Sequence, residues 1–427
     1  MARAPQLSSV KGTDDLFEDE LATWRRVEQI ARETFHAYGF GEIRTPILEE
    51  TAVFVRGVGE GTDIVGKEMF AFDDGGDGDG VTNVCLRPEN TAPVVRAMVQ
   101  HGKLFADAFE QVFYIGPMFR RERPQAGRRR QFHQIGCEAF GFAEPGMDIA
   151  VIAAVHTLLE RLGVASATKL HLNSLGDAAD REGYSKALVE YFGAHEDKLS
   201  EDSRRRLREN PLRILDSKDP GDQKLVVDAP KPLAWLSEAA KAHFDAVQAG
   251  LTRLGIPFIV DTALVRGLDY YTRTVFEFVG EAGLGAQSTV AAGGRYDGLV
   301  ETLGGRPTPA VGFAAGIERL ILMMTALGTT AAAPVPSLYL VGADDAGRAL
   351  VDQLAFGLRL QGVVVGADVR GRSVKAQMKA ADKSQARLSA VIGSGEIEAG
   401  TVKVKTMATG DVREIGLDVA AFAALLR

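Results

Sequence analysis

The sequence predicts two folded units: an α+β unit built on an antiparallel sheet with a helical insertion, and a smaller α/β unit after it. In the first, strand-like segments follow one another without regular crossover helices, which favours antiparallel pairing. A charged, mostly helical stretch over about 177–249 interrupts them and indicates an insertion. A Pro/Ala-rich linker at 331–336 then separates a first domain over 1–330 from a second over 337–427.

The first unit begins with an amphipathic helix predicted over 18–39. Its apolar residues recur at steps of three and four, and Gly39 follows as a stop. A short strand over 42–45 meets Pro46, which suits a strand end or a sheet edge. The segment DDGGDGDG at 73–80 indicates a hairpin loop.

Further along the first unit, residues 111–119 and 131–142 are predicted to form two strands around an arginine-rich loop. A helix is expected over 148–163. Beyond the insertion, strand-like segments return over 256–314, and a helix follows over 315–327.

The second unit alternates strand-like segments (SLYLVG, VVVGADV, LSAVIG) with helices predicted from about 344 and 372. This βαβαβ order is typical of a small, largely parallel α/β domain. The spacing predicts five basic residues on one face of the second helix, with Arg370 just before it: Arg372, Lys375, Lys379, Lys383 and Arg387. An all-basic row suits a phosphate backbone, but a solvated helix face stays an alternative.

Composition narrows the class of protein. The 427 residues are 46% hydrophobic and 25% charged, which is ordinary for a soluble globular protein of two or three domains. No apolar run approaches membrane-spanning length, and the first ten residues lack the apolar stretch of a secretory signal. Cys85 and Cys137 form no C-x-x-C pair, which fits a reducing cytoplasm. The seven histidines show no metal-ligand spacing, so no protein metal site is expected.

The net charge of −8 is unevenly distributed. Residues 331–427 hold 12 Lys and Arg against 10 Asp and Glu, a net charge of +2, which leaves −10 for the rest of the chain. A slightly basic unit on an acidic body hints at a polyanionic partner.

The segment FRRERPQAGRRRQFHQIGCEAF at 119–140 carries the most chemistry. It places six arginines within eleven residues, and so much like charge calls for an anion, which Arg can grip with two donors at once. In the strand that follows, alternation puts Phe132, Gln134, Gly136 and Glu138 on one face. That face could form the floor of a binding site for a small polar ligand, although an ordinary half-exposed strand would also show such a pattern.

Three other segments carry polar groups. LVRGLDYYTRTVFEF at 264–278 places a cation, an anion and two phenols just before a strand. LRPENTAP at 86–93 holds Glu89 and Thr91, which a capped helix would explain equally well. AVGFAAGIERL at 310–320 ends in Glu318 and Arg319, which could form a plain surface pair.

Together these segments resemble the histidyl-tRNA synthetases, which are class II aminoacyl-tRNA synthetases. FRRERPQAGRRRQFHQIGCE looks like motif 2, GFAAGIERL like motif 3, and the helix, strand and proline of 18–46 like motif 1. RGLDYYTRTVFEF and AAGGRYDGL (291–299) resemble the histidine-specific motifs, and KGTDDL and NPLRILDSKDP match too. The resemblance covers essentially the whole chain. It implies an antiparallel-sheet catalytic domain with a helical insertion, a C-terminal anticodon-binding domain and a homodimer.

The resemblance also implies a reaction: histidine and ATP give histidyl-adenylate, and histidine tRNA then takes the histidyl group. Arg120 would hold the α-phosphate with Arg266 across from it, so these two are the expected catalytic residues. Glu122 would fix the adenine, and Phe132 would stack on it with Arg319 over the other face. Mg²⁺ is expected with the ATP phosphates.

The remaining roles concern histidine and tRNA. Glu89, Thr91 and Gln134 would take the α-amino group. Histidine binding in the resemblance further involves Glu138 and Tyr271, on the two imidazole nitrogens, and Tyr270. Asn90 departs from the family, where many relatives carry a smaller residue. The expected tRNA contacts are Arg123, Gln125, Arg372, Lys375 and Lys379.

Two other functions fit parts of the sequence. One is a catalytically silent, synthetase-like regulatory subunit of ATP phosphoribosyltransferase; such paralogues usually lose the RGLDYY-type motif and the C-terminal domain, and this chain keeps both. The other is an ATP-dependent amino-acid ligase that uses no tRNA, against which the basic loop and the basic row argue.

Overall fold

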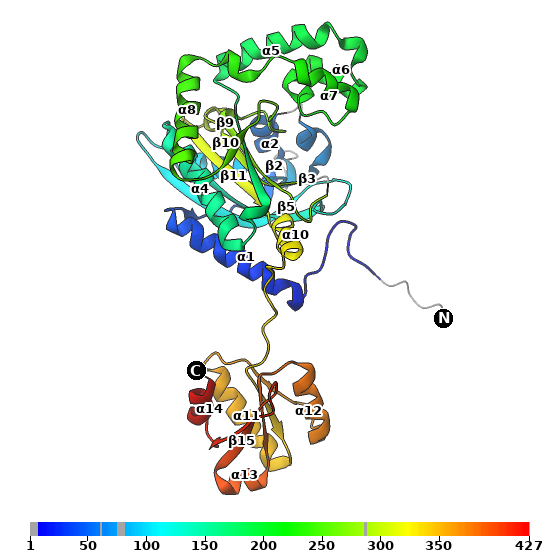
Figure 1. Cartoon of the computed structure of the whole chain (residues 1–427), viewed down its shortest axis with the longest axis vertical. Coiled ribbons are helices and arrows are strands. Elements are labelled where there is room, and N and C mark those ends of the chain that lie inside the picture. Colours follow the sequence, from blue (N-terminus) through cyan, green and yellow to red (C-terminus); the bar gives the residue numbers. More distant parts are fainter. Residues whose placement is uncertain (1–6, 60–61, 75–81, 286–287, 427) are drawn as a thin grey trace, which may run out of the picture. The chain divides into compact units, whose positions relative to one another are not determined.

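The computed structural model describes residues 7–59, 62–74, 82–285 and 288–426. The chain divides into two compact units, of which the first ends at Ala331 and the second begins at Ala332 (Figure 1). Residues 75–80 of the expected hairpin loop lie outside the described residues. Within the described ranges, every helix is too short or too polar to cross a membrane.

The first unit is built on an eight-stranded sheet. Its strands, in spatial order, are β1 (Gly41–Glu42), β5 (Glu110–Phe119), β6 (Gln131–Phe140), β11 (Ala310–Gly316), β10 (Thr289–Arg295), β9 (Thr272–Gly280), β7 (Thr168–Ser174) and β8 (Phe258–Val260). The six central strands pair antiparallel, which confirms the predicted fold class. The edge strands β1 and β8 pair parallel with their neighbours, which the sequence did not reveal.

Four helices cover one face of this sheet: α1 (Glu18–Ala37), α4 (Pro145–Leu162), α8 (Glu238–Arg253) and α10 (Ile317–Leu327). The apolar stripe of α1, with Val27, Ala31 and Phe35, is fully buried there. Ile135 and Cys137 of β6 lie in the same core, so the predicted alternation along that strand is confirmed. Complete burial of a side chain the size of Val, Ile or Phe stabilises the fold by about 1.5–3 kcal/mol.

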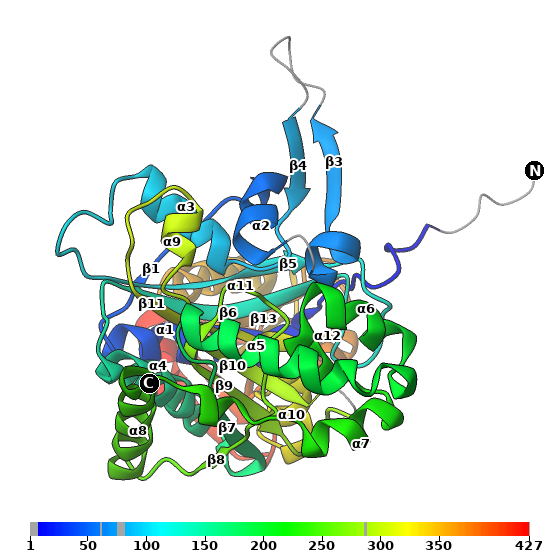
Figure 2. The same cartoon turned by 90° about the horizontal axis from the view of Figure 1, so that it is seen from above.

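The opposite face carries the shorter elements, including α3 (Thr91–Gln100), the small helix α9 (Leu299–Thr302) and part of the insertion. Beside them lie α2 (Thr51–Val58), the π-helix Ile64–Glu68 and a three-stranded sheet of β2 (Leu48–Glu50), β4 (Thr82–Leu86) and β3 (Phe70–Asp74). Figure 2 shows β3 and β4 extending away from the large sheet.

The insertion consists of short helices joined by single turns. They are α5 (Ala178–Gly193), α6 (Glu201–Glu209) and α7 (Pro220–Asp228), with 3-10 turns at Glu196–Lys198, Pro211–Ile214 and Pro232–Trp235; a further turn, Ala165–Ala167, precedes β7. The structure differs from the expected segment at its C-terminal end. Residues 238–249 belong to α8, whose Phe244 and Val247 pack in the main core with α4. Composition alone did not separate this helix from the insertion because its exposed face is equally polar.

The second unit has a five-stranded sheet in the order β13 (Val365–Ala367), β12 (Leu338–Gly342), β14 (Leu388–Ile392), β15 (Thr401–Thr406) and β16 (Val412–Gly416). The first three strands are parallel, and β15 and β16 continue the sheet antiparallel. Its helices are α11 (Asp345–Arg359), α12 (Val374–Lys383), α13 (Ser394–Ala399) and α14 (Val419–Leu426). The α/β class is confirmed, although the sheet is mixed.

The basic row of the second unit is shorter than expected. Lys375, Lys379 and Lys383 lie on α12 and are exposed. The helix ends at Lys383, and Gln385 takes a left-handed φ of 55°, so Arg387 lies beyond a turn. Arg372 precedes the helix and pairs with Asp368. The prediction of five basic residues on one helix is therefore wrong, because the turn breaks the spacing after three.

Candidate active site

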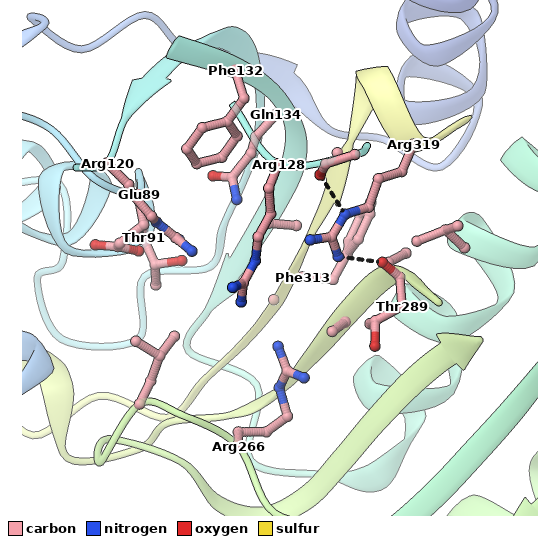
Figure 3. Close-up of a pocket in the computed structure, with 18 of the residues that line it drawn as sticks. Glu89, Thr91, Arg120, Arg128, Phe132, Gln134, Arg266, Thr289, Phe313 and Arg319 are labelled. Carbon is pink, nitrogen blue, oxygen red and sulfur yellow. Dashed lines mark hydrogen bonds between the residues drawn. The ribbon is translucent and has the colours of Figure 1, made fainter. Parts of the chain in front are cut away.

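A pocket opens over β6, β11 and β10, and most of the expected site residues line it (Figure 3). They come from segments that lie far apart in the sequence: the start of α3, the loop between β5 and β6, the segment before β9, and the start of α10. The lining includes Glu89, Thr91, Arg120, Glu122, Phe132, Gln134, Arg266, Tyr270, Tyr271 and Arg319. The antiparallel sheet thus brings the chemistry of four motifs to one cavity.

One part of the pocket presents hydrogen-bond acceptors. The Glu89 carboxylate accepts from the backbone N–H groups of Thr91 (2.8 Å) and Ala92 (3.0 Å), which fixes it at the N-terminus of α3. Burial raises the pKa of Glu89, and these two N–H groups oppose the rise. Gln134 Oε1 is buried and accepts no hydrogen bond from any described residue. A carboxylate beside an unpaired amide oxygen suits an ammonium group.

Glu138 lies one layer below the lining. It is fully buried, and its carboxyl group contacts the hydroxyls of Thr91 (2.8 Å) and Tyr296. Burial raises the pKa of Glu138 to about 8. A Cβ atom at Gly312 would lie 1.8 Å from Glu138 Oε2, so only glycine fits there. The buried carboxyl group therefore supports the floor and is held by the pocket's own hydroxyls.

Three tyrosines form the wall above this floor. The ring centroid of Tyr270 lies 4.7 Å from that of Tyr271 and 5.5 Å from that of Tyr296. Tyr296 was not assigned a role from the sequence, although the quoted motif AAGGRYDGL contains it. Its neighbour Arg295 is fully buried, pairs with Asp148 and fixes this turn against α4.

The other part of the pocket is cationic. The guanidinium groups of Arg120, Arg128, Arg266 and Arg319 point toward one space (Figure 3). Arg319 donates to the carbonyl oxygens of Gly127 (3.1 Å) and Thr289 (2.6 Å). Burial lowers the pKa of Arg319, and the neighbouring arginines add to the effect. Four cations held around one cavity repel each other unless a polyanion lies between them.

Arg266 is held by a carboxylate outside the pocket lining. It forms an ion pair with Glu277 of β9, which also accepts from the Thr289 hydroxyl at 3.0 Å. Arg266 Nε is buried and donates to no acceptor in the described part of the chain. The side chain is thus anchored at one end and keeps a free donor.

An aromatic platform adjoins the cations. The Arg120 guanidinium carbon lies 5.1 Å from the centroid of the Phe132 ring. Arg120 Nε donates to the carbonyl oxygen of Pro88 at 2.9 Å, and Glu122 lies 2.7 Å from Arg128 Nε. A planar ring beside a fixed guanidinium group can stack on a flat heteroaromatic ligand.

Some expected residues lie elsewhere. Arg123 and Gln125 are exposed and do not line the pocket. The backbone of Gln125 pairs with that of Arg128, which makes a tight loop tip. Asn90 is buried and accepts from Thr45 (2.6 Å) and Arg87 (3.1 Å) outside the pocket lining, so its larger side chain does not narrow the site.

Comparison with known proteins identifies this combination. Residues 12–320 match the family model described as histidyl-tRNA synthetase, and residues 338–425 match an anticodon binding domain. The chain belongs to the histidyl-tRNA synthetase family. The histidine–tRNA ligases of Anaeromyxobacter dehalogenans and Streptococcus uberis are both 47% identical to it, over 96% and 97% of this chain and 98% and 96% of their own lengths.

Solved structures agree with this family. The structure of the apo histidyl-tRNA synthetase of S. aureus matches with a TM-score of 0.82 and 34% identity, over 98% of this chain and 99% of that one. A histidyl-tRNA synthetase from Nostoc shares the fold at 20% identity, with a TM-score of 0.69 over 99% of this chain.

Proposed function

We propose that this protein joins L-histidine to histidine tRNA at the expense of ATP, through histidyl-adenylate. The observation that carries the proposal is one pocket that sets an acceptor end, with Glu89 and Gln134, beside a cluster of four arginines. The acceptor end suits the ammonium group of an amino acid, and the arginines suit the phosphates of ATP.

In the first step, a carboxylate oxygen of histidine attacks the α-phosphorus of ATP. The bond from that phosphorus to the bridging oxygen of pyrophosphate breaks, and pyrophosphate leaves with the electron pair. Arg120 and Arg266 act on the phosphoryl oxygens as their charge grows. Because Arg266 is anchored on Glu277 and keeps a free donor, it needs little rearrangement to stabilise the transition state.

In the second step, the 3′-terminal hydroxyl of the tRNA attacks the carbonyl carbon of histidyl-adenylate. The ester bond to tRNA forms, AMP leaves, and the hydroxyl proton is released. The pocket supports this step by keeping the ammonium on Glu89, Thr91 and Gln134.

Specificity in this proposal comes from the two ends of the pocket. Phe132 and Arg319 sandwich the adenine, which Glu122 fixes at its edge. Tyr271 and Glu138 address the two imidazole nitrogens, with Tyr270 packed beside them. Another amino acid would not form hydrogen bonds with both of these groups, and such rejection can reach about 10⁴-fold.

Mg²⁺ would enter on the phosphates of ATP and would supply charge neutralisation there. This metal is commonly held by one or two carboxylates and by substrate phosphates. Glu318 lines the pocket next to Arg319 in sequence, so it fits as such a carboxylate. Its two oxygens also accept from the backbone N–H of His133, at 2.9 and 3.0 Å, which fixes their position.

For tRNA, the exposed loop tip with Arg123 and Gln125 would contact the acceptor end. Lys375 and Lys379 of α12, together with Arg372, would contact the anticodon stem.

The protein would act in the cytoplasm as a homodimer. Exposed apolar side chains on the β2–β4–β3 sheet and next to it, such as Leu48 and Phe72, support self-association. Sedimentation velocity tests the dimer, and a purely monomeric species would contradict it.

The regulatory-subunit alternative is not favoured, because the chain keeps the arginines that line the pocket and a matched anticodon binding domain. Histidine-dependent exchange of labelled pyrophosphate into ATP, followed by charging of purified histidine tRNA, tests the proposal. Both activities are expected. Absence of exchange with folded protein would refute the enzyme, and exchange without charging would leave the ligase that uses no tRNA.

A further inference from the structure

Arg181 of the insertion is a cation that hydrogen-bonds to backbone carbonyls instead of pairing with a carboxylate. It lies on α5, half-buried, and no carboxylate of the described residues pairs with it within 4 Å. Its Nη1 instead donates to two backbone carbonyls of the tyrosine segment, that of Asp269 at 3.1 Å and that of Tyr271 at 2.7 Å. Burial lowers the pKa of Arg181, as expected for a cation that gives up water for neutral acceptors.

A second contact from the insertion reaches the same turn. Asn210 Nδ2 donates to Asp269 Oδ1 at 2.8 Å. On the other side, the backbone N–H of Asp269 faces the carbonyl oxygen of Val58 at 3.4 Å, and a Cβ atom at Gly59 would lie 2.8 Å from Asp269 Oδ2. The turn is therefore clasped between α2 and the insertion.

The backbone carbonyl groups of this turn need hydrogen-bond donors from outside the sheet. Residues 269–271 precede β9, which begins at Thr272, so their carbonyls have no sheet partner. Arg273 takes a left-handed φ of 45°, which shows that the backbone enters the strand through an irregular step. Buried carbonyls without donors are costly, so the guanidinium of Arg181 does what a neighbouring strand would do in a regular sheet.

The side chains on this turn form the histidine end of the proposed pocket. Tyr270 and Tyr271 line it, and the Tyr271 side chain is held over the floor by ring contact with Tyr270. A shift of the turn would move both phenols together.

We propose that Arg181 is a positioning residue: through it, and through Asn210, the helical insertion fixes the backbone of 269–271 and so sets the affinity for histidine. The proposal rests on the proposed function and deepens it. It also explains Asp269, whose carboxylate faces the insertion instead of the pocket.

The test uses the full chain and three variants. Arg181→Met removes both hydrogen bonds but keeps a long apolar stem, and Arg181→Lys keeps the charge and a donor nitrogen but on a shorter side chain. Arg204→Met is the matched control, because Arg204 also donates to two carbonyls, those of Glu196 and Asp197 at 3.0 Å each, within the insertion alone. Steady-state pyrophosphate exchange gives kcat and KM for histidine and ATP.

For Arg181→Met we expect the KM for histidine to rise about tenfold or more, with the KM for ATP unchanged and kcat within about threefold. Arg181→Lys should restore part of the loss, and Arg204→Met should match the unmodified protein. An unchanged KM for histidine in Arg181→Met would overturn the proposal. If that variant does not fold, Asn210→Ala is expected to show the same split between the two KM values, and its absence would overturn the proposal equally.

Amide hydrogen exchange without ligands separates this proposal from the proposed function. Peptides covering 268–274 should exchange faster in Arg181→Met, and peptides covering 310–316 of β11 should not. If the unmodified protein shows no histidine-dependent exchange of pyrophosphate, the proposed function fails. The role of Arg181 would be refuted separately, if the amide groups of 268–274 were protected equally in Arg181→Met and in the unmodified protein.

Discussion

The chain has two basic regions that look alike in sequence and differ in structure. Arginines of the loop between β5 and β6 help to ring a pocket, where Arg120 and Arg128 are partly buried and held by carbonyl or carboxylate groups. Lys375 and Lys379 on α12 are exposed, and no described acidic side chain pairs with them within 4 Å. The first region has its charges fixed in place, and the second has them in water.

This difference separates two uses of positive charge. Fixed, desolvated cations act strongly on charge that develops at one atom, and they are little affected by salt. Solvated lysines act on an extended polyanion by releasing its counterions, so their effect falls steeply with salt. The pocket should therefore govern the chemical step, and α12 should govern only the encounter with tRNA.

The sharpest test of the fixed cations is Arg266→Ala. We expect pyrophosphate exchange to slow by about 10²–10³-fold, because a preorganised donor to the phosphoryl oxygens is lost. The KM for histidine should change little, since the acceptor end stays intact. Pyrophosphate exchange, measured over a range of histidine concentrations, checks both parts.

Arg25→Ala is the matched control for Arg266→Ala. Arg25 also pairs with a glutamate, Glu18, but it lies on the exposed face of α1, so exchange should remain at the level of the unmodified protein. Exchange at that level in Arg266→Ala itself would remove Arg266 from the catalytic step.

Glu138 offers the second test, because its proton is controlled by burial. The folded protein holds the pKa of Glu138 at about 8, above the ordinary 4.5, so it binds this proton more tightly than the unfolded chain does. The free energy of unfolding must then fall as pH rises from about 5 to 8, on the order of 3 kcal/mol from this group. Glu138→Gln should remove that part of the decline.

Chemical denaturation at pH 5.5, 7 and 8.5 measures this effect. Glu20→Gln, at an exposed position of α1, should keep the full pH dependence. If Glu138→Gln and the unmodified protein lost stability in parallel over this range, the carboxyl group would be ionised throughout.

The pocket lining could be predicted from the sequence to a large extent, because its residues fall in segments with uncommon composition. Six arginines in eleven residues, or two tyrosines beside a charge pair, require an explanation that a core does not supply. Tyr296 was missed because a single tyrosine after a buried arginine looks like any core residue. Its contact with Glu138 joins residues 158 positions apart, which no local pattern reveals.

Other features escaped the sequence for the same physical reason. The ends of α12 are set by the turn at Gln385, and five basic residues at helical spacing continue past it without any signal. The parallel edge strand β1 is only two residues long, so its pairing with β5 is decided by tertiary packing. Arg181 lies in a helix that also carries exposed charged residues such as Glu182 and Lys186, and only the structure shows that it reaches the tyrosine turn.

The solvated lysines are tested by Lys375→Glu combined with Lys379→Glu. We expect the KM for tRNA to rise about tenfold at ~0.15 M salt, because two counterion-releasing contacts are replaced by repulsion. The dependence of charging on salt should also weaken by about two units of slope. Pyrophosphate exchange without tRNA should be unaffected.

The matched control reverses the charge of two other exposed lysines of the same unit, Lys403→Glu with Lys405→Glu on β15. It makes the same change in net charge, so equal loss of charging in both pairs would point to a nonspecific effect of charge. If the α12 variant lost pyrophosphate exchange as well as tRNA charging, the conclusion that this helix acts only in tRNA binding would be refuted.

Arg123→Ala has the smallest expected effect. Arg123 shares one property with each of the two basic regions. Arg123 belongs to the pocket loop by sequence, yet it is exposed like the lysines of α12. A single exposed contact is worth about 1 kcal/mol, so charging should slow about fivefold while exchange stays unchanged. Arg44→Ala, whose side chain is 78% exposed on the same unit, serves as the control. A matching loss of exchange would place Arg123 with the fixed cations of the pocket, and the boundary between the two kinds of basic region would then lie at the tip of the loop.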